Sequence, residues 1–379
     1  MRIAINTRFL LPNKMEGFGW YTYETVKRIV LSHPEHEFCF FFDRKFDDTF
    51  LFADNVVPVV IGPPARHPIL FKIWFNRSVT KAIKKYQIDA FISPDGYLSL
   101  KTDVPQLAVI HDLNFEHYPE DIPASPRKYL RTYFPKFAKR ADIILTVSNF
   151  SKQDLVSTYG VCPEKIDVAY NGVAPFFKPI SNGEKDELKK ELTAGADYFV
   201  FVGSLHPRKN LARLLKSFDL FKEQDDQNFK LLVVGASLWG DSFGTKLMEQ
   251  VKFKEDVLFT GHISSEKLHK TIASAYAMTF VSYFEGFGIP VAEAMTCGVP
   301  VILSDKTSLP EVGGEVAIYV DPFDETSISN AMIDLANDPD RRVDLALKSI
   351  KQGQKFTRDK SAEGLCNCFE KMAQNNQKK

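Results

Sequence analysis

The stretch "FEGFGIPVAEAMTCGVPVILSD", Phe284–Asp305, contains the local signals from which the fold can be argued. It follows one apolar run, "MTFVS", and ends in another, "VPVILSD". Between them, Pro290 favours a helix start, because the N–H that proline lacks would have no partner there anyway, and Gly298 favours the helix end. A strand, a short helix and a second strand in this order predict a βαβ unit with parallel strands.

The same alternation continues along the whole chain. Short apolar runs bounded by turns alternate with helix-period segments, which lie at residues 21–31, 70–86, 125–140, 211–221 and 264–275. The runs are "RIAIN", "FCFFF", "VVPVVI", "DAFIS", "QLAVIHD", "DIILTVS" and "KIDVAYNG" before a break at 173–182, and "YFVFVGS", "KLLVVGA", "VLFTGH", "MTFVS", "VPVILSD" and "AIYVDP" after it. We therefore predict an α/β protein of two Rossmann-like, doubly wound domains, residues 1–176 and 183–356, with a ligand in a cleft between them.

Composition limits the classes of function. The 379 residues include 48 basic and 48 acidic side chains, a balance that argues against a nucleic-acid partner. Five cysteines form no C-x-x-C pair, which favours reduced thiols in a cytoplasmic protein. Asn6 and Arg8 interrupt "MRIAINTRFL" too early for a secretory segment, and no run approaches the ~18–20 apolar residues of a membrane span.

Two glutamates stand eight positions apart in the opening stretch. The glycines and proline between them prevent one continuous helix, so Glu285 is expected on a loop and Glu293 in the first helical turn. The amides of Phe287, Gly288 and Ile289 would point out of the helix start and form an anion site. The alternative is a packed glycine-rich turn in which Glu293 only offsets the helix dipole.

A second anion site is predicted in "GSLHPRKNL", Gly203–Leu211. It follows a strand and opens a helix, which places Arg208 and Lys209 beside free amides, as suits a phosphate or diphosphate. Alone, this segment could equally be a solvated loop. Two anion-ready helix starts in one domain favour a diphosphate ligand.

Two features of the first half are also candidates. Gly17 and Gly19 in "EGFGWYTYE" could let the backbone approach a ligand or merely form a turn, and "VIHDLN" places His111 at the carboxyl end of a strand, where it could also be structural. Neither "GFGWYT" nor "GFGIPV" has the third glycine of G-x-G-x-x-G, which makes a dehydrogenase a poor interpretation.

Metal ligands are not indicated by the sequence. "DPD", Asp338–Asp340, resembles an acidic metal motif, but its place between two helical segments favours a capping turn. No other cluster of His, Asp and Glu has metal-ligand spacing in the sequence. We expect no metal and no cofactor.

Together these motifs resemble family 4 of the retaining glycosyltransferases with the GT-B fold, in particular bacterial mannosyltransferase-like members that build surface polysaccharide. The resemblance covers essentially the whole chain. It rests on "EGFGIPVAEAMTCGVPV", "SLPEVGGEVAIYVDP", "HPRKNL", "HDLNFEHYPE", "VSNFSKQDL" and "FTRDKSAEGL". It also implies that residues 357–379 cross back to the first domain.

The resemblance assigns roles to matching positions. It implies that Glu285 holds the hydroxyls of the donor sugar and Glu293 those of the nucleotide ribose. The remaining implied contacts are the amides of Gly286, Phe287, Gly288 and Ile289 with sugar and phosphate, Lys209 with Arg208 on the diphosphate, His111 near the reacting carbon, and Gly17 and Gly19 beside diphosphate and acceptor. Many members carry Arg where this chain has Ser204, so either Arg208 takes over that charge or diphosphate binding is weaker.

The implied reaction transfers a hexose, mannose by resemblance, from a nucleoside-diphosphate sugar such as GDP-mannose to a glycan or lipid-linked glycan. The departing diphosphate would be stabilised by cations and a helix start without a metal. A retaining glycosidase would need two carboxylates ~5–5.5 Å apart around the sugar, which the predicted helix start between the glutamates opposes. The alternatives are a disaccharide synthase or phosphorylase of the same fold and a non-catalytic nucleotide-sugar binder.

A further hypothesis concerns the membrane. "SPRKYLRTYFPKFAKR", residues 125–140, carries six basic residues and no acidic one, interleaved with aromatic residues, and "HPILFKIWFNRSVTKAIKKY" is similar. Such faces suit an anionic lipid surface at the inner side of the plasma membrane. Ordinary solvated helices are the alternative.

Overall fold

The computed structural model describes residues 1–12, 15, 17–224, 227–235 and 247–377. The chain forms two compact units, Met1–Gly172 together with Arg358–Lys379, and Val173–Thr357. The chain thus leaves the first unit after residue 172, four residues before the boundary expected at 176, and returns to it at residue 358. The segment 173–181 contains no helix or strand, and Ser181 and Glu184 close a capping box at the first helix beyond it.

The first unit is built on a sheet of seven strands. They are β1 (Arg2–Asn6), β2 (Glu37–Phe42), β3 (Val56–Val60), β4 (Ala90–Ser93), β5 (Gln106–Val109), β6 (Ile143–Thr146) and β7 (Ile166–Val168). Their order is β3-β2-β1-β4-β5-β6-β7, and every pairing is parallel. Each of the seven apolar runs predicted in this half of the chain is a strand.

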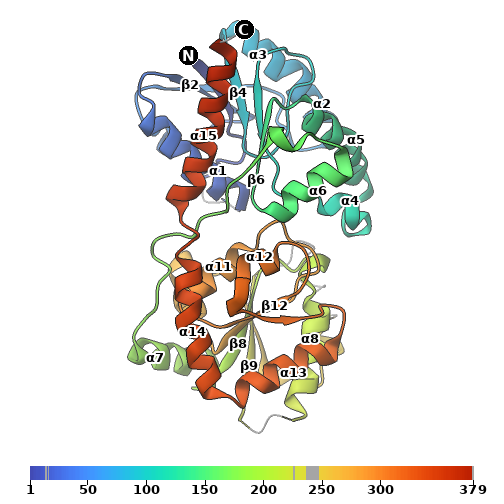
Figure 1. Cartoon of the computed structure of the whole chain (residues 1–379), viewed down its shortest axis with the longest axis vertical. Helices are drawn as coiled ribbons and strands as arrows, with labels where there is room; N and C mark the ends of the chain where they lie inside the picture. Colours follow the sequence, from blue (N-terminus) through green and yellow to red (C-terminus); the bar gives the residue numbers. More distant parts are fainter. Residues whose placement is uncertain (13–14, 16, 225–226, 236–246, 378–379) are drawn as a thin grey trace. The chain divides into compact units, whose positions relative to one another are not determined.

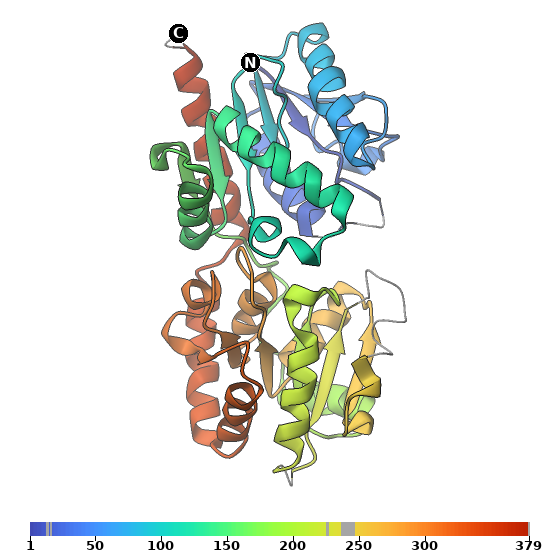
Figure 2. The same ribbon diagram turned by 90° about the vertical axis from the view of Figure 1, so that its right-hand side faces the viewer.

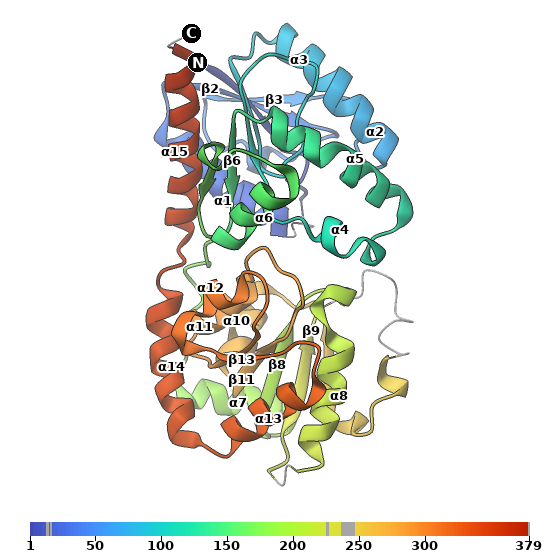
Figure 3. The ribbon, with the colours of Figure 1, turned by 45° about the vertical axis from the view of Figure 1, so that its right-hand side comes forward.

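Helices cover both faces of this sheet (Figures 1 and 3). They are α1 (Gly17–Ser32), α2 (Pro68–Ile73), the π-helix η2 (Trp74–Val79), α3 (Thr80–Lys85), α4 (Asn114–His117), α5 (Ala124–Arg140), α6 (Asn149–Tyr159) and α15 (Arg358–Gln377). Alternate side chains of β1 serve the two faces: Ile3 and Ile5 share a core with α1 and α15, whereas Ala4 shares one with η2, α5 and α6. The period of two in a parallel strand explains this division.

The C-terminal helix α15 is part of the first unit. It contacts α1 and the strands β5, β6 and β7, and in Figure 2 its red ribbon runs beside the green strands of that sheet. Arg28 of α1 donates to Asp359 at 2.7 Å, and Arg358 pairs with Glu24. Leu365 and Phe369 are at most 1% exposed and complete the core on this face.

The predicted helix at 70–86 differs from the prediction of one segment. It consists of α2, the π-helix η2 and α3, with Trp74, Phe75 and Val79 of the π-helix fully buried. A widened turn of this kind shifts the buried face by one residue, which a search for a 3.6-residue period does not detect.

The second unit is built on six strands, β8 (Tyr198–Val202), β9 (Lys230–Val234), β10 (Val257–Gly261), β11 (Ala277–Phe280), β12 (Val301–Ser304) and β13 (Ile318–Val320). Their order is β10-β9-β8-β11-β12-β13, again parallel throughout. All six runs predicted after the break are strands, and "MTFVS" and "VPVILSD" are adjacent strands, as the βαβ prediction requires.

Helices again occupy both faces. α8 (Leu211–Lys222) and α13 (Glu325–Ala336) pack against each other on one face. In a second group of helices, α10 (Ser265–Ala273) contacts α7 (Asn182–Thr193) and α11 (Ile289–Thr296), and α11 contacts α14 (Pro339–Gly353). α12 (Leu309–Gly313) follows β12. Asp338 caps α14 by accepting from the amide of Arg341, which confirms the capping interpretation of "DPD".

Each sheet has one position where the chain order reverses, between β1 and β4 in the first unit and between β8 and β11 in the second. Loops that leave neighbouring strands on either side of such a reversal diverge, and this is where open α/β sheets bind ligands. The predicted Lys209 and Glu285 follow β8 and β11, so the second unit brings both to this position.

Candidate active site

The reversal point of the second unit holds a buried cluster of three charges. The ammonium of Lys209 lies 2.6 Å from Glu285 Oε1, and Arg208 Nη1 lies 2.7 Å from Glu285 Oε2. Lys209 and Arg208 belong to a 3-10 helix, Pro207–Lys209, directly before α8. Two cations around one carboxylate leave a net charge of +1, which suits an anionic ligand.

Backbone contacts fix the two loops to each other. Arg208 accepts from the amide of Tyr283 through its carbonyl at 3.1 Å, and its Nη1 donates to the carbonyl of Phe284 at 3.1 Å. The side-chain amide of Asn210 donates to the carbonyls of Val281 and Pro322. The loop after β8 and the loop after β11 are therefore one hydrogen-bonded unit.

Glu285 is ionised in this environment. Burial alone would raise the pKa of its carboxyl, but the charges of Arg208 and Lys209 and their hydrogen bonds outweigh burial and lower the pKa to about 2. At neutral pH Glu285 therefore accepts hydrogen bonds and has no proton to give. This argues against a role as a general acid and fits the holding of hydroxyl groups.

The start of α11 adds amides to this site. Gly288 precedes the helix with a φ of 104°, and a Cβ there would lie 2.9 Å from Leu309 Cδ2, so only glycine fits. Ser308 donates to the carbonyls of Glu285 and Phe287, and Thr307 accepts from the amide of Glu285. Pro290 has no N–H, and the amides of Val291 and Ala292 donate to the carbonyl of Gly288, so the amide of Ile289 is the donor that the first turn of α11 has left for an anion.

The structure corrects the position of Glu293. Because α11 begins at Ile289, one residue before the predicted Pro290, Glu293 lies in the second turn and not in the first. It is half-buried, and its neighbours Ala292 and Ala294 are fully buried, as expected for a helix packed nearly all round. A mere offset of the helix dipole is weaker at this distance from the helix end.

Ser204 follows β8 and is half-buried. Next to it, Gly203 approaches the loop after β9 so closely that a Cβ on Gly235 would lie 1.9 Å from the Gly203 carbonyl oxygen. Lys209 also packs its chain near Gly203. This strand-end segment is thus close to the Lys209 side chain, although Ser204 itself brings no charge.

In the first unit, His111 follows β5 and lies between two aromatic rings, with centroids 4.9 Å from Phe18 and 4.8 Å from Tyr21. Its Nε2 lies 3.0 Å from the carbonyl oxygen of Pro94. Because a carbonyl only accepts, Nε2 carries the proton and Nδ1 has a lone pair. Burial lowers the pKa of His111, so the ring is neutral at pH 7.

The loop that carries Pro94 is held by a buried polar network. Asp95 accepts from Asn6 at 2.8 Å and from Ser93 at 2.9 Å, and Arg8 Nε lies 2.7 Å from its other oxygen. The Arg8 guanidinium lies over the rings of four aromatic residues, Phe9, Phe71, Phe75 and Tyr97. The network therefore fixes the carbonyl that orients His111.

Gly17 and Gly19 form the first turn of α1. A Cβ on Gly19 would lie 2.8 Å from the carbonyl oxygen of Phe9, so packing against the protein's own backbone is enough to explain this glycine. Gly17 is exposed, with open space around its Cα. Glu16, which begins the quoted motif, lies outside the described residues.

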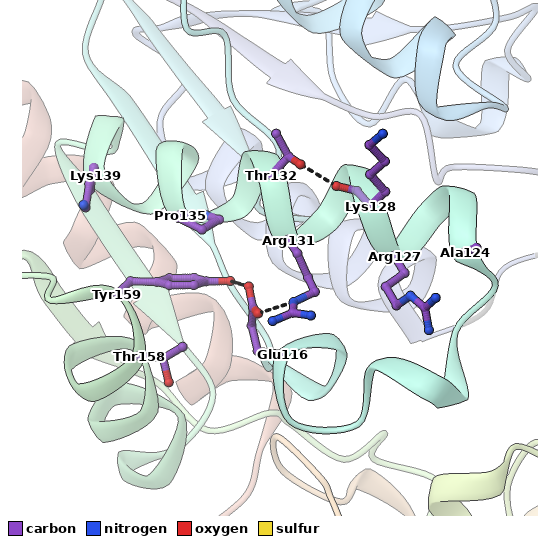
Figure 4. A pocket seen from close by; sticks show the side chains of 10 residues that line it. All are labelled: Glu116, Ala124, Arg127, Lys128, Arg131, Thr132, Pro135, Lys139, Thr158 and Tyr159. Carbon is purple, nitrogen blue, oxygen red and sulfur yellow. Dashed lines mark hydrogen bonds and ion pairs between the residues drawn. The ribbon is translucent and has the colours of Figure 1, made fainter.

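A basic pocket of about 740 Å³ lies in the first unit, beside α4, α5 and α6 (Figure 4). Arg131 Nε donates to Glu116 at 2.9 Å, Tyr159 donates to the same carboxylate at 3.0 Å, and Arg127 donates to the carbonyl of Pro119. Lys139 also lines the pocket. Figure 4 shows Arg127 and Arg131 on the Glu116 side of α5, whereas Lys128 points away.

The structure therefore groups the predicted residues in two places. Arg208, Lys209, Ser204, Glu285 and the residues from Gly286 to Glu293 belong to the second unit, and His111, Gly17 and Gly19 to the first. Sequence reasoning missed the supporting residues Asp95, Thr307 and Ser308. Their signal was available: each is a polar residue just after the carboxyl end of an apolar strand.

Two parallel, doubly wound α/β units, one of them with a cationic site at its reversal point, have the architecture of the GT-B fold of glycosyltransferases. Residues 16–175 match the family model Glycosyltransferase Family 4, and residues 184–355 match the model Glycosyl transferases group 1. The chain belongs to this family of glycosyltransferases, and each half of it is one of the two family domains.

Curated relatives agree with this assignment, and solved structures agree with the fold. O-antigen chain mannosyltransferase B of Escherichia coli is 26% identical over 354 residues, which are 90% of this chain and 93% of that protein. O-antigen chain mannosyltransferase RfbU of Salmonella typhimurium is 32% identical over 235 residues, 62% of each. Sucrose-phosphate synthase from Thermosynechococcus elongatus has a similar fold, with a TM-score of 0.78, 19% identity and 99% coverage of both chains. Anabaena HepE, solved with UDP and glucose, has a TM-score of 0.75 with 17% identity, covering 98% of this chain and 100% of that one.

Proposed function

We propose that this glycosyltransferase moves a mannosyl unit from GDP-mannose to a glycan or lipid-linked glycan, with retention of the anomeric configuration. The observation that carries the proposal is the Arg208–Lys209–Glu285 cluster at the reversal point of the second unit. Two relatives, both O-antigen mannosyltransferases, support mannose as the sugar and a glycan as the acceptor.

The cluster suits a sugar diphosphate because it offers both kinds of recognition. Arg208 and Lys209 supply positive charge where negative charge grows on the departing phosphate, and the positive end of the α11 dipole adds to it. Glu285, ionised at neutral pH, accepts hydrogen bonds from sugar hydroxyls. In the proposal Glu293, farther along α11, binds the ribose.

The proposed step breaks the bond between the anomeric carbon and the β-phosphate oxygen. An acceptor hydroxyl forms the new bond on the same face of the sugar, and its proton passes to the departing phosphate. His111 accepts a hydrogen bond from a sugar hydroxyl through Nδ1, because its Nε2–H is used by Pro94. No protein carboxylate needs to act as nucleophile or acid in this step.

A panel of nucleotide sugars tests the donor. GDP-mannose should raise the melting temperature more than UDP-glucose or other sugar nucleotides, because a ligand that binds only the folded state stabilises it. Stabilisation by UDP sugars without any by GDP-mannose would contradict the proposed donor. The anomeric configuration of the product, read from NMR couplings, tests retention independently, and an inverted product excludes it.

The acceptor separates the proposal from its main alternative. A disaccharide synthase or phosphorylase would use a soluble sugar or phosphate, so equal turnover with free monosaccharides and with a lipid-linked glycan would favour that alternative. A non-catalytic binder would show no turnover with any acceptor. In either outcome, binding of the nucleotide sugar would still be measured separately by melting temperature.

The proposal also includes catalysis without a metal, since the charge on the diphosphate is assigned to Arg208, Lys209 and α11. Transfer should therefore persist in EDTA. Loss of transfer in EDTA, with recovery on adding manganese or magnesium, would show that a metal does this work.

Peripheral contact with an anionic membrane is the last part of the proposal, and charge supports it better than aromatic insertion. Of the aromatic residues in α5, Tyr129, Phe134 and Phe137 are buried in the core, and Tyr133 is half-buried. Four of the six basic side chains of α5, Arg127, Lys128, Arg131 and Lys139, line the pocket of Figure 4, and all of them but the half-buried Arg127 are exposed. In the described part of the chain, no helix is long and apolar enough to span a bilayer.

A further inference from the structure

Three potential metal ligands from distant parts of the sequence meet in the first unit, away from the residues assigned to transfer. His33 follows α1, whereas Cys366 and Glu370 lie one turn apart on α15 and so face the same way. His33 Nε2 lies 3.0 Å from Cys366 Sγ and 3.8 Å from Glu370 Oε1. Cys366 Sγ and Glu370 Oε1 are 3.9 Å apart.

The orientation of the His33 ring matches that of a metal ligand. Its Nδ1 lies 3.1 Å from Glu35 Oε1, and an ionised carboxylate only accepts, so Nδ1 carries the proton. The lone pair of Nε2 then points toward Cys366 and Glu370. A carboxylate that accepts from the second ring nitrogen is the usual partner of a metal-bound histidine, because it fixes both tautomer and ring orientation.

The distances between these atoms fit a tetrahedral ion. Zinc binds nitrogen, sulfur and oxygen at about 2.0–2.3 Å, which places neighbouring ligand atoms of a tetrahedron about 3.3–3.8 Å apart. The three observed separations, 3.0, 3.8 and 3.9 Å, bracket this range. The side chains of His33 and Cys366 are half-buried, whereas that of Glu370 is half exposed. The exposed side leaves room for a water as the fourth ligand.

We propose that His33, Cys366 and Glu370 bind one zinc ion, with Glu35 as the outer carboxylate that orients His33. Binding displaces the thiol proton of Cys366 to solvent and involves no change of oxidation state. The ordinary alternative is a hydrogen-bonded cluster in which the Cys366 thiol donates to His33 and no metal binds.

The position of this site indicates a structural role. His33 and Glu35 precede β2, whereas His111 follows β5, and both strands belong to one parallel sheet. The cluster therefore lies at the amino-terminal ends of the strands of that sheet, and His111 lies at their carboxyl-terminal ends. A metal at the amino-terminal ends of the strands would join α15 to the connection between α1 and β2. The ring of Phe369 is close by and contacts His33 at a centroid distance of 5.5 Å.

Cobalt tests the site directly on the full-length protein, after chelation and removal of the chelator. Co²⁺ bound through a thiolate gives a sulfur-to-metal charge-transfer absorption, and we expect this band to saturate at one ion per chain. Cys366→Ser should abolish the band. His33→Gln removes a direct ligand, so it should weaken metal binding by more than the roughly 10–100-fold that the loss of an outer partner such as Glu35 costs. Zinc should displace the cobalt and raise the melting temperature of the wild type but not that of Cys366→Ser.

Cys162→Ser is the matched control. Cys162 is exposed and its thiol lies 2.6 Å from Glu164, so it offers a thiol and a carboxylate without the oriented imidazole. The Cys162→Ser protein should keep the full cobalt band. The inference is overturned if no thiolate band forms, or if the band survives Cys366→Ser in protein whose melting temperature without metal equals that of the wild type. Because the readout is spectroscopic, failure here leaves the proposed transferase function untouched.

Discussion

The two units carry the same kind of ion pair at the same topological position but use it differently. In the first unit Arg8, after β1, pairs with Asp95, after β4; in the second, Lys209, after β8, pairs with Glu285, after β11. The Arg8 guanidinium is enclosed by aromatic rings, whereas the second pair has Arg208 and the start of α11 beside it. The topology thus places a buried ion pair at the same position in both units. The residues around each pair determine whether it only holds two loops together, as a structural pair, or also belongs to a binding site.

The sharpest way to break this comparison is to remove the cation from each pair. Arg8→Met should lower the free energy of unfolding by about 3–5 kcal/mol, because it leaves the buried Asp95 carboxylate without its cation. Lys209→Met should lower it less, because Glu285 keeps its ion pair with Arg208. In protein that remains folded, Lys209→Met should also reduce transfer by roughly 10²–10³-fold. Arg8→Met should reduce transfer less, because Arg8 acts only through the loop whose Pro94 carbonyl orients His111. Urea unfolding and turnover at a temperature where both variants are folded measure the two effects.

Equal losses of turnover in Arg8→Met and Lys209→Met would contradict the distinction between a structural pair in the first unit and a binding-site pair in the second. The double variant Lys209→Met/Glu285→Gln is the control for stability. It removes both charges of the pair and leaves no buried carboxylate, so it should recover part of the unfolding free energy without recovering turnover.

The next largest effect is expected when low pH protonates Glu285 of the Lys209–Glu285 pair. The pKa of Glu285 is lowered from 4.5 to about 2, because Arg208 and Lys209 outweigh the effect of burial. A lowered pKa means that its contribution to stability is present above the unfolded pKa and is lost as the pH falls from about 4.5 through 2. The contribution is on the order of 3 kcal/mol. Unfolding free energies of the wild type and Glu285→Gln at several pH values should converge at low pH. Parallel curves over this range would show that Glu285 is not the group responsible.

The two glutamates of the opening stretch should separate in ligand binding. Glu293→Ala should weaken binding of free GDP by about 1.5–3 kcal/mol, the range for a hydrogen bond to a charged group. Glu285→Gln should leave GDP affinity unchanged or improve it, because Arg208 and Lys209 no longer share their charge with a carboxylate, while turnover falls. Calorimetric titration with GDP, together with transfer assays, measures both. Equal losses of GDP affinity in the two variants would refute the assigned roles.

The smallest expected effect is on membrane binding by the exposed basic residues of α5, which lie in the first unit but do not belong to the Arg8–Asp95 pair. Arg131→Gln/Lys139→Gln should reduce flotation with phosphatidylglycerol vesicles at low salt, by about 1 kcal/mol per residue. Lys136→Gln is the control: it lies on the same helix and is exposed, but it does not line the pocket. Equal binding of the wild type to neutral and anionic vesicles, or equal losses in control and double variant, would exclude a membrane role for the pocket.

The strands could be read from sequence because each one is a short apolar run that a buried parallel sheet requires. The loop before α11 was also predictable, since Gly286, Gly288 and Pro290 leave few other conformations. The pairing of Lys209 with Glu285 was not. These residues are 76 positions apart, and they meet only because β8 and β11 are neighbours in the sheet. The order of strands is a property of the whole unit and leaves no mark in either motif.

The same limit explains the His33 cluster and the Asp95 network. His33 and Cys366 are 333 positions apart, and Asn6 and Asp95 are 89 apart, so no spacing rule joins them. Asn6, Arg8 and Asp95 were visible as polar residues at strand ends, but only the parallel pairing of β1 with β4 shows that they satisfy one another.

The return of the chain to its first unit through α15 sets an order of assembly on the ribosome. The second unit is continuous in sequence, so it can close its core once residue 357 has emerged. The first unit must wait for Leu365, Phe369 and Met372, which fill the core beside α1. Multidomain chains usually fold from the amino terminus onward. In this protein the half that is synthesised first is the last whose hydrophobic core can be completed.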